Sequence, residues 1–76
     1  MELKQTLKTL CERLKELRIE QKMTQKELAK ATGLSQSAIA YWETGQRIPS
    51  ALSVIALAEY FHVSIDYLIG LKNKQK

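Results

Sequence analysis

Helix start and stop signals divide this 76-residue chain into short segments, and they constrain its fold more than any other feature. The residues Thr24-Gln25-Lys26-Glu27 form a capping box. In this motif the Thr24 hydroxyl accepts a hydrogen bond from an early amide of the helix, and the Glu27 carboxylate accepts one from the Thr24 amide. Further N-caps are expected at Ser35, Ser50 and Ser64, and helix ends near Gly33, Gly45 and Gly70. These signals predict five helices, over residues 2–22, 25–32, 36–43, 51–61 and 65–69.

The spacing of apolar residues supports the same division. In the first segment they recur every three or four positions and share one helical face, at Leu3, Leu7, Leu10, Leu14 and Leu17. The segment 51–61 is apolar nearly all round, so we expect it at the centre of the core. No alternating strand pattern or hairpin signal occurs, and the sequence therefore predicts an all-α, compact five-helix bundle.

Length and composition exclude several classes of protein. A chain of 8.7 kDa forms one domain with little room for a cofactor or substrate cavity. Cys11 has no partner for an internal disulfide, and His62 at a helix end is interpreted as a capping or packing residue. We therefore expect no enzyme activity, cofactor, metal site or small-molecule ligand. No apolar run is long enough for a membrane span, and a cytoplasmic protein is expected.

The most informative stretch joins the second and third predicted helices through Gly33-Leu34-Ser35. A tight turn between two steeply crossing helices needs a small residue at their contact, which Ala29 supplies, and a residue such as Gly33 that tolerates the turn. Ile39 and Trp42 lie three apart and mark the buried face of the third helix. Its other face stays free, and a protruding helix about 10–12 Å across fits the DNA major groove.

With these residues in place, the span from about Leu14 to Gly70 resembles the lambda-repressor-like (Cro and XRE type) helix-turn-helix domain. The matching residues occur in five consecutive elements: Leu17-Arg18, Met23-Thr24-Gln25, Glu27-Leu28-Ala29, Gly33-Leu34-Ser35, Ile39, Trp42-Glu43, Gly45, Arg47, Pro49, Leu57-Ala58, Val63-Ser64, Asp66 and Leu68. Arg18 lies at the margin of the apolar face, where a cation needs an acidic partner. The resemblance supplies Glu43 as that partner in a structural ion pair.

The resemblance also implies a function, which is sequence-specific binding of double-stranded DNA by a transcriptional regulator, expected to be a repressor. The family's base-contacting positions match Gln36, Ser37, Ala40 and Tyr41, all on the free face of the helix 36–43. Phosphate contacts are expected from Gln25, Ser35, Thr44 and Arg47. Relatives bind two-fold symmetric operators as dimers, so a homodimer is expected. The alternative is a protein-interaction module, such as an antitoxin or adaptor that uses the same fold.

Charge by itself says little about this function. The formal charge is +4, but Lys72, Lys74 and Lys76 supply 3 of it, in a stretch 71–76 that we interpret as a basic flexible tail after a domain over 1–70. The segment 36–43 contains no Lys or Arg, which predicts a shallow dependence of DNA affinity on salt. Candidates for the dimer contact are Tyr60, Tyr67, Ile69 and Leu71, with burial against the first helix as their alternative.

Overall fold

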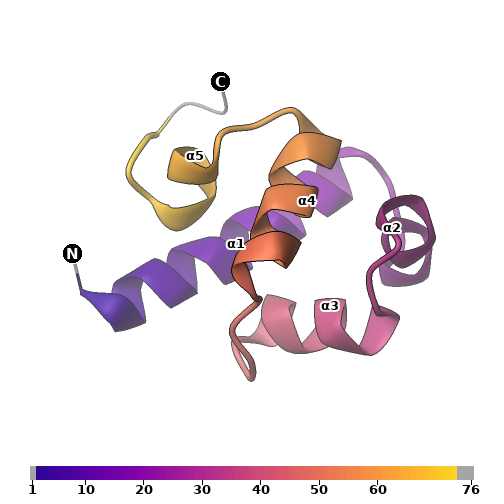
Figure 1. Cartoon of the computed structure of the whole chain (residues 1–76), viewed down its shortest axis with the longest axis horizontal. Coiled ribbons are helices and arrows are strands. Elements are labelled where there is room, and N and C mark those ends of the chain that lie inside the picture. Colours follow the sequence, from indigo (N-terminus) through magenta and orange to yellow (C-terminus); the bar gives the residue numbers. More distant parts are fainter. Residues whose placement is uncertain (1, 74–76) are drawn as a thin grey trace.

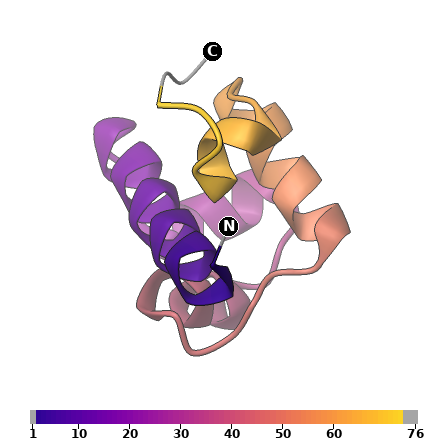
Figure 2. The ribbon, with the colours of Figure 1, turned by 90° about the vertical axis from the view of Figure 1, so that its left-hand side faces the viewer.

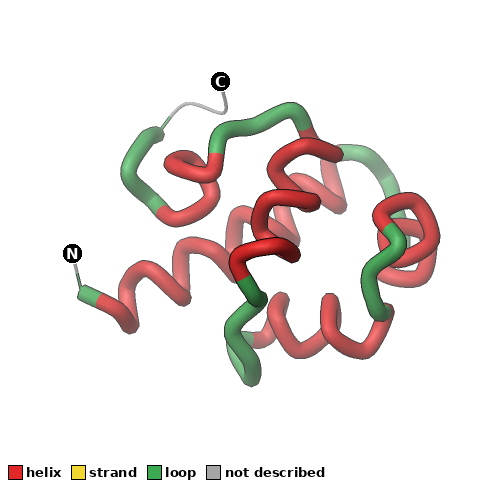
Figure 3. Tube along the Cα trace, in the orientation of Figure 1, coloured by secondary structure: helices red, strands yellow, loops and turns green. Residues whose placement is uncertain are grey.

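The computed structural model describes residues 2–73, and within them it contains five α-helices and no strand (Figures 1 and 3). Their bounds are α1 (Leu3–Glu20), α2 (Gln25–Thr32), α3 (Gln36–Thr44), α4 (Ala51–Phe61) and α5 (Ile65–Ile69). The radius of gyration is 11.2 Å. The predicted all-α fold is therefore confirmed. The two helices predicted to form the helix-turn-helix, α2 and α3, lie side by side at one edge of the molecule.

The predicted helix starts and stops have the expected chemistry. Four helices begin with a side-chain hydroxyl that accepts a hydrogen bond from the third amide of the helix, at Thr24, Ser35, Ser50 and Ser64. The capping box is complete, because the Thr24 amide also donates to the Glu27 carboxylate at 2.8 Å. Gly33, Gly45 and Gly70 take the left-handed conformation after α2, α3 and α5.

Two helix ends differ from the prediction. Helix α1 ends at Glu20, two residues before the predicted Lys22, because Lys22 itself has a left-handed backbone, with φ of 56°, that a right-handed helix cannot contain. Helix α3 extends one residue further than predicted, to Thr44. The sequence does not reveal the end of α1, because Lys is a good helix former and gives no stop signal.

The core takes one fully buried aliphatic side chain from every helix. These five side chains are Leu14, Leu28, Ile39, Leu57 and Leu68. In Figure 1, α4 passes in front of α1, with α2 and α3 at one edge and α5 at the other. The quarter turn of Figure 2 shows α1 and α4 on different sides of the molecule and keeps α3 on the edge opposite α5. This arrangement leaves one long side of α3 outside the core.

The expectation that α4 is central on all sides is wrong. Leu57, Ala58 and Phe61 are buried, but Leu52 is 79% exposed and Ile55 is 38% exposed. A domain of this size has too few helices to cover α4 on both sides, so its apolar composition exceeds what the core can accept. The result is an apolar surface on the outer side of α4.

The chain stays attached to the bundle after α5. The amides of Leu71 and Lys72 both donate to the Asp66 carbonyl oxygen, and the Arg13 guanidinium donates to the Lys72 carbonyl oxygen at 2.6 Å. The predicted tail at 71–76 is thus held through Lys72 by backbone hydrogen bonds that its polar composition did not suggest. Residues 74–76, with two of its three lysines, lie outside the described part.

Candidate nucleic-acid interface

Helices α2 and α3 meet at the predicted turn. Leu34 in the turn packs against the core, and Ala29 of α2 is buried in it. The Thr32 hydroxyl donates to the Leu28 carbonyl oxygen at 2.7 Å and accepts from the Leu34 amide at 3.3 Å. The Thr32 hydroxyl thus connects the last turn of α2 to the backbone of the turn that follows it.

An ion pair connects α1 to the C-terminal end of α3. The Arg18 Nε lies 2.7 Å from Glu43 Oε2 and its second nitrogen lies 3.0 Å from Oε1, so the guanidinium binds the carboxylate with two hydrogen bonds. The third nitrogen donates to the Met23 carbonyl oxygen at 2.6 Å. The side chains are only 13% and 3% exposed, and the bonds to Glu43 raise the pKa of Arg18 above its ordinary value.

Gln25 takes part in this network, which the sequence did not predict. Its side-chain amide donates to Glu43 Oε1 at 3.1 Å, so the carboxylate accepts from both α1 and α2. We predicted Gln25 as a phosphate contact, and in the free chain its side chain is engaged inside the protein. Its backbone amide stays at the N-terminus of α2, where a phosphate would be favoured.

The outward side of α3 carries the four predicted base contacts. Gln36 and Ser37 are exposed, Ala40 is partly exposed and Tyr41 is 39% exposed. Ile39 and Trp42 on the opposite side are buried in the core. The structure therefore brings the four predicted side chains onto one helix surface whose side chains are all uncharged.

The remaining predicted phosphate contacts surround this surface. The Ser35 hydroxyl caps α3 by accepting from the Ala38 amide at 3.2 Å. The Thr44 hydroxyl donates within α3, to the carbonyl oxygens of Ala40 and Tyr41. Arg47 follows α3 in the loop before α4, and its guanidinium carbon lies 4.9 Å from the centre of the Tyr41 ring. No feature of the sequence predicted that stack.

Arg13 is a second arginine of α1 that sequence reasoning missed. Its guanidinium lies 4.3 Å over the Tyr67 ring and donates to the carbonyl oxygens of Tyr67 and Lys72. Tyr67 is consequently buried, with 6% of its surface exposed, and its proposed exposure for dimer contact is wrong. The acceptors are backbone oxygens, which residue identity does not reveal.

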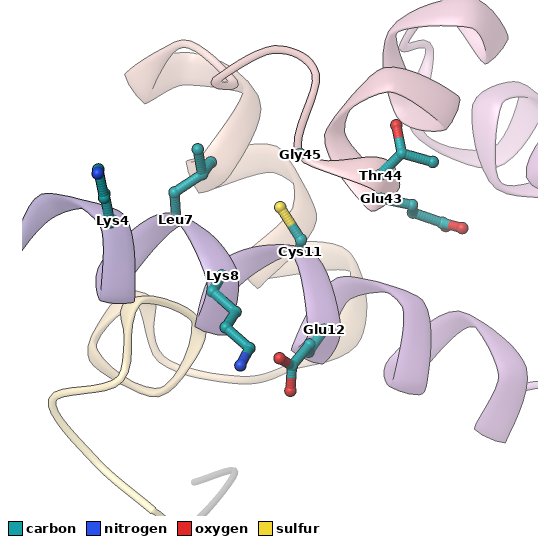
Figure 4. A pocket seen from close by; sticks show the side chains of 8 residues that line it. All are labelled: Lys4, Leu7, Lys8, Cys11, Glu12, Glu43, Thr44 and Gly45. Carbon is teal, nitrogen blue, oxygen red and sulfur yellow. The ribbon is translucent and has the colours of Figure 1, made fainter.

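A hollow of about 320 Å³ lies between the first half of α1 and the C-terminal end of α3. Figure 4 shows Leu7 and Cys11 extending toward the Gly45 side, while the charged ends of Lys8 and Glu12 extend to the other side of α1. Burial raises the pKa of the Cys11 thiol, which disfavours a reactive thiolate. In the described part of the chain, every buried side-chain nitrogen and oxygen has a hydrogen-bond partner.

Two further properties of the described residues concern metal binding and membrane insertion. Between residues 2 and 73, no three His, Cys, Asp or Glu side chains gather as they would around a metal ion. None of the helices that the structure describes has the length and hydropathy to cross a membrane.

The five helices, with α2 and α3 joined by a tight turn, form a helix-turn-helix fold. A family model described as "Helix-turn-helix" matches residues 14–68, from the middle of α1 to α5. The chain belongs to this helix-turn-helix family, which is of the Cro/C1 type. The family resemblance inferred from the residues is thereby confirmed.

The similar proteins come from bacteria. An uncharacterized HTH-type transcriptional regulator of Bacillus subtilis, YobD, is 34% identical over 61 residues, which make up 80% of this chain and 54% of YobD. The HTH-type transcriptional activator BcrR of Enterococcus faecalis is 36% identical over 59 residues, 78% of this chain and 29% of BcrR. The chain thus spans about half or less of these curated relatives.

A solved structure agrees more fully in length. The crystal structure of the restriction-modification controller protein C.AhdI from Aeromonas hydrophila matches with a TM-score of 0.74 and 32% identity. The match covers 82% of this chain and 94% of C.AhdI. The fold of this chain is therefore that of a known helix-turn-helix protein over nearly all of the latter's length.

Proposed function

We propose that this chain binds a specific double-stranded DNA sequence by placing α3 in the major groove. The observation that carries the proposal is the uncharged outward surface of α3, held at the edge of the molecule while Ile39 and Trp42 anchor the opposite side in the core. The Gln36 side-chain amide has the donor and acceptor needed to bind adenine N6 and N7 together. Ser37 offers a hydroxyl, Ala40 offers a methyl group to thymine, and Tyr41 lies beside them.

Phosphate contacts on either side of the groove would fix the register. The N-termini of α2 and α3 present backbone amides and a partial positive charge at Gln25 and Ser35. Arg47 supplies a full charge beyond the C-terminal end of α3. Thr44 would join these contacts only by exchanging its bonds inside α3, so we rank it last among the four.

The DNA-bound state is proposed to be a homodimer on a two-fold symmetric operator. One helix as short as α3 reads only a few base pairs, and two half-sites multiply the discrimination. Leu71 is exposed, as predicted for a dimer contact, and Leu52 and Ile55 of α4 add exposed apolar area that the sequence did not suggest. Sedimentation of the chain alone and on operator DNA tests this: a monomeric mass in both states contradicts it.

Repression is the form of regulation that we propose, because a domain bound over a promoter blocks access to the DNA that it covers. The name of BcrR shows that this similarity also extends to an activator. The site of action would be the cytoplasm, where bacterial DNA is accessible. Expression of a reporter gene with the operator at its promoter distinguishes repression from activation: repression lowers expression when the protein is present, and activation raises it.

The function as a whole is tested by selecting bound duplexes from random DNA. The proposal predicts that an inverted repeat is enriched, and that the enriched duplex binds far more tightly than a scrambled one at the same salt concentration. If no sequence is enriched and no duplex binds below micromolar concentration at low salt, the DNA-binding proposal fails. The alternative of a protein-interaction module would then stand.

A further inference from the structure

Arg47 has an unusual place in the charge distribution of this chain. It is the single Lys or Arg between residues 31 and 71, a span that includes α3, α4 and α5. Its side chain is exposed, and it forms no ion pair with any residue in the part of the chain that the structure describes. The one cation in this span is therefore free to meet a phosphate.

The end of α3 determines where this cation lies. Gly45 takes a left-handed conformation with φ of 78°, which turns the chain back so that the Gln46 amide donates to the Tyr41 carbonyl oxygen at 2.9 Å. Arg47 comes next in the chain and is thereby carried to the Tyr41 side of α3. In Figures 1 and 2 this loop extends at the same edge of the molecule as α3.

The contact itself is a cation stacked on an aromatic ring. The guanidinium carbon of Arg47 lies 4.9 Å from the centre of the Tyr41 ring, within the range of a cation–π interaction. A guanidinium is planar, so a ring can cover its face while the N–H donors along its edge stay free for a bidentate contact with phosphate. The ring also restricts a long side chain before DNA arrives, which lowers the ordering cost of binding.

We propose that Tyr41 is a positioning residue, whose ring holds the Arg47 guanidinium for a DNA phosphate beside the groove that α3 enters. This inference rests on the proposed DNA-binding function and refines it. Tyr41 then acts through its ring and through Arg47, whereas its hydroxyl makes no required contact with a base edge. Because α3 itself carries no cation, the orientation of this one guanidinium has a large share in placing the protein on the duplex.

The test compares Arg47→Ala, Tyr41→Ala, Tyr41→Phe and the double variant Tyr41→Ala/Arg47→Ala. Affinity is measured over a range of salt concentrations, for the duplex that the wild-type chain selects from random DNA. Arg47→Ala should weaken binding about tenfold and reduce the salt slope by about 1, the change expected for one lost phosphate contact. Tyr41→Ala should lose about fivefold in affinity and part of the same slope, since the cation then stays unrestrained.

Two results separate positioning from a direct base contact. Tyr41→Phe keeps the ring and should bind within about twofold of wild type, and the double variant should be no more than about twofold weaker than Arg47→Ala. Equal losses in Tyr41→Phe and Tyr41→Ala would overturn the proposal by assigning the effect to the hydroxyl. Losses that multiply in the double variant would also overturn it, because the two residues would then act independently.

A measurement without DNA tests the stack in the free chain. The Arg47 Cδ protons should show an upfield ring-current shift in the NMR spectrum of wild type and Tyr41→Phe, and lose it in Tyr41→Ala. An unchanged shift in Tyr41→Ala overturns the proposal. If the wild-type chain binds no duplex, the proposed DNA-binding function fails, and this inference fails with it. If the wild-type chain binds DNA but the effects of the two substitutions multiply in the double variant, only the inference on Tyr41 is overturned.

Discussion

Two arginines of the same helix hold α1 to the rest of the molecule in different ways. Arg18 joins α1 to α3 through a bidentate bond to the Glu43 carboxylate, a junction that we call the α3 joint. Arg13 joins α1 to α5 through two carbonyl oxygens and the Tyr67 ring, and we call this the α5 joint. The family model includes the first arginine and begins one residue after the second.

The difference between the joints lies in what each one fixes. Glu43 is the next-to-last residue of α3, so the α3 joint sets the position of the helix that we propose reads DNA. It buries a carboxylate that has no other cation bonded to it in the described part of the chain. The α5 joint uses neutral acceptors on the far edge of the molecule. We therefore expect the first to affect stability and DNA binding together, and the second to affect stability alone.

The largest effect is expected from Arg18→Ala. This variant leaves a carboxylate that is 3% exposed without its cation, and removing one partner of a buried pair costs about 3–5 kcal/mol. The free energy of unfolding from urea titration measures the loss. A decrease in the free energy of unfolding of less than about 1 kcal/mol is typical of a solvent-exposed ion pair, and it would contradict the stabilising role of the α3 joint.

Arg13→Ala is expected to cost less. It removes a cation–π contact and hydrogen bonds to two carbonyl oxygens at a partly exposed site, which together are worth about 1–2 kcal/mol. DNA affinity, measured at a temperature where the variant is fully folded, should stay at the wild-type value. A loss of affinity under that condition would show that the two joints are coupled.

Between residues 2 and 73, two residues outside the glycines have a left-handed backbone. Lys22 follows α1 near the α3 joint, and His62 ends α4 just before α5, both with φ of 56°. Glycine adopts this conformation without the steric penalty of a Cβ, so Lys22→Gly and His62→Gly should each stabilise the fold by up to about 1 kcal/mol. Thermal unfolding measures the gain, and matched Ala variants should show none of it.

The smallest expected effect concerns acid and the start of α2. Hydrogen bonds from the Thr24 amide to the Glu27 carboxylate lower the pKa of Glu27 below its ordinary value. A carboxyl with a lowered folded-state pKa stabilises the fold above its unfolded pKa, near about 4.3, and this contribution disappears as the pH falls through the folded value. Glu27→Gln should flatten that part of the stability profile. An identical profile in Glu27→Gln would assign the acid sensitivity to other carboxyls.

Local chemistry explains how much of the fold was predictable. The starts of α2 and α3 at Thr24 and Ser35, and the end of α2 at Gly33, depend on residues within one helical turn. They can therefore be predicted from the local sequence. Arg18 was recognisable as a cation that needs an acid, and the family resemblance identified Glu43. The stop at Lys22 depends instead on a backbone conformation that its side chain does not favour.

The missed features depend on packing between distant segments. The acceptors of Arg13 are backbone oxygens that any residue could supply, so nothing in the sequence pointed to Tyr67 or Lys72. The phosphate contact of Gln25 stays a prediction, but nothing in the sequence indicated that its side-chain amide donates to Glu43 of α3. The exposure of Leu52 likewise depends on how many helices are available to cover α4.

The central claim is that neutral groups on α3 read the DNA sequence. Its most direct test measures the binding of wild type and Gln36→Ala to the selected duplex and to a scrambled one at equal salt. We expect Gln36→Ala to lower the preference for the selected duplex about tenfold, with unchanged affinity for the scrambled duplex and an unchanged free energy of unfolding. Equal affinity of wild type for both duplexes, or an equal loss on both in the variant, would contradict it.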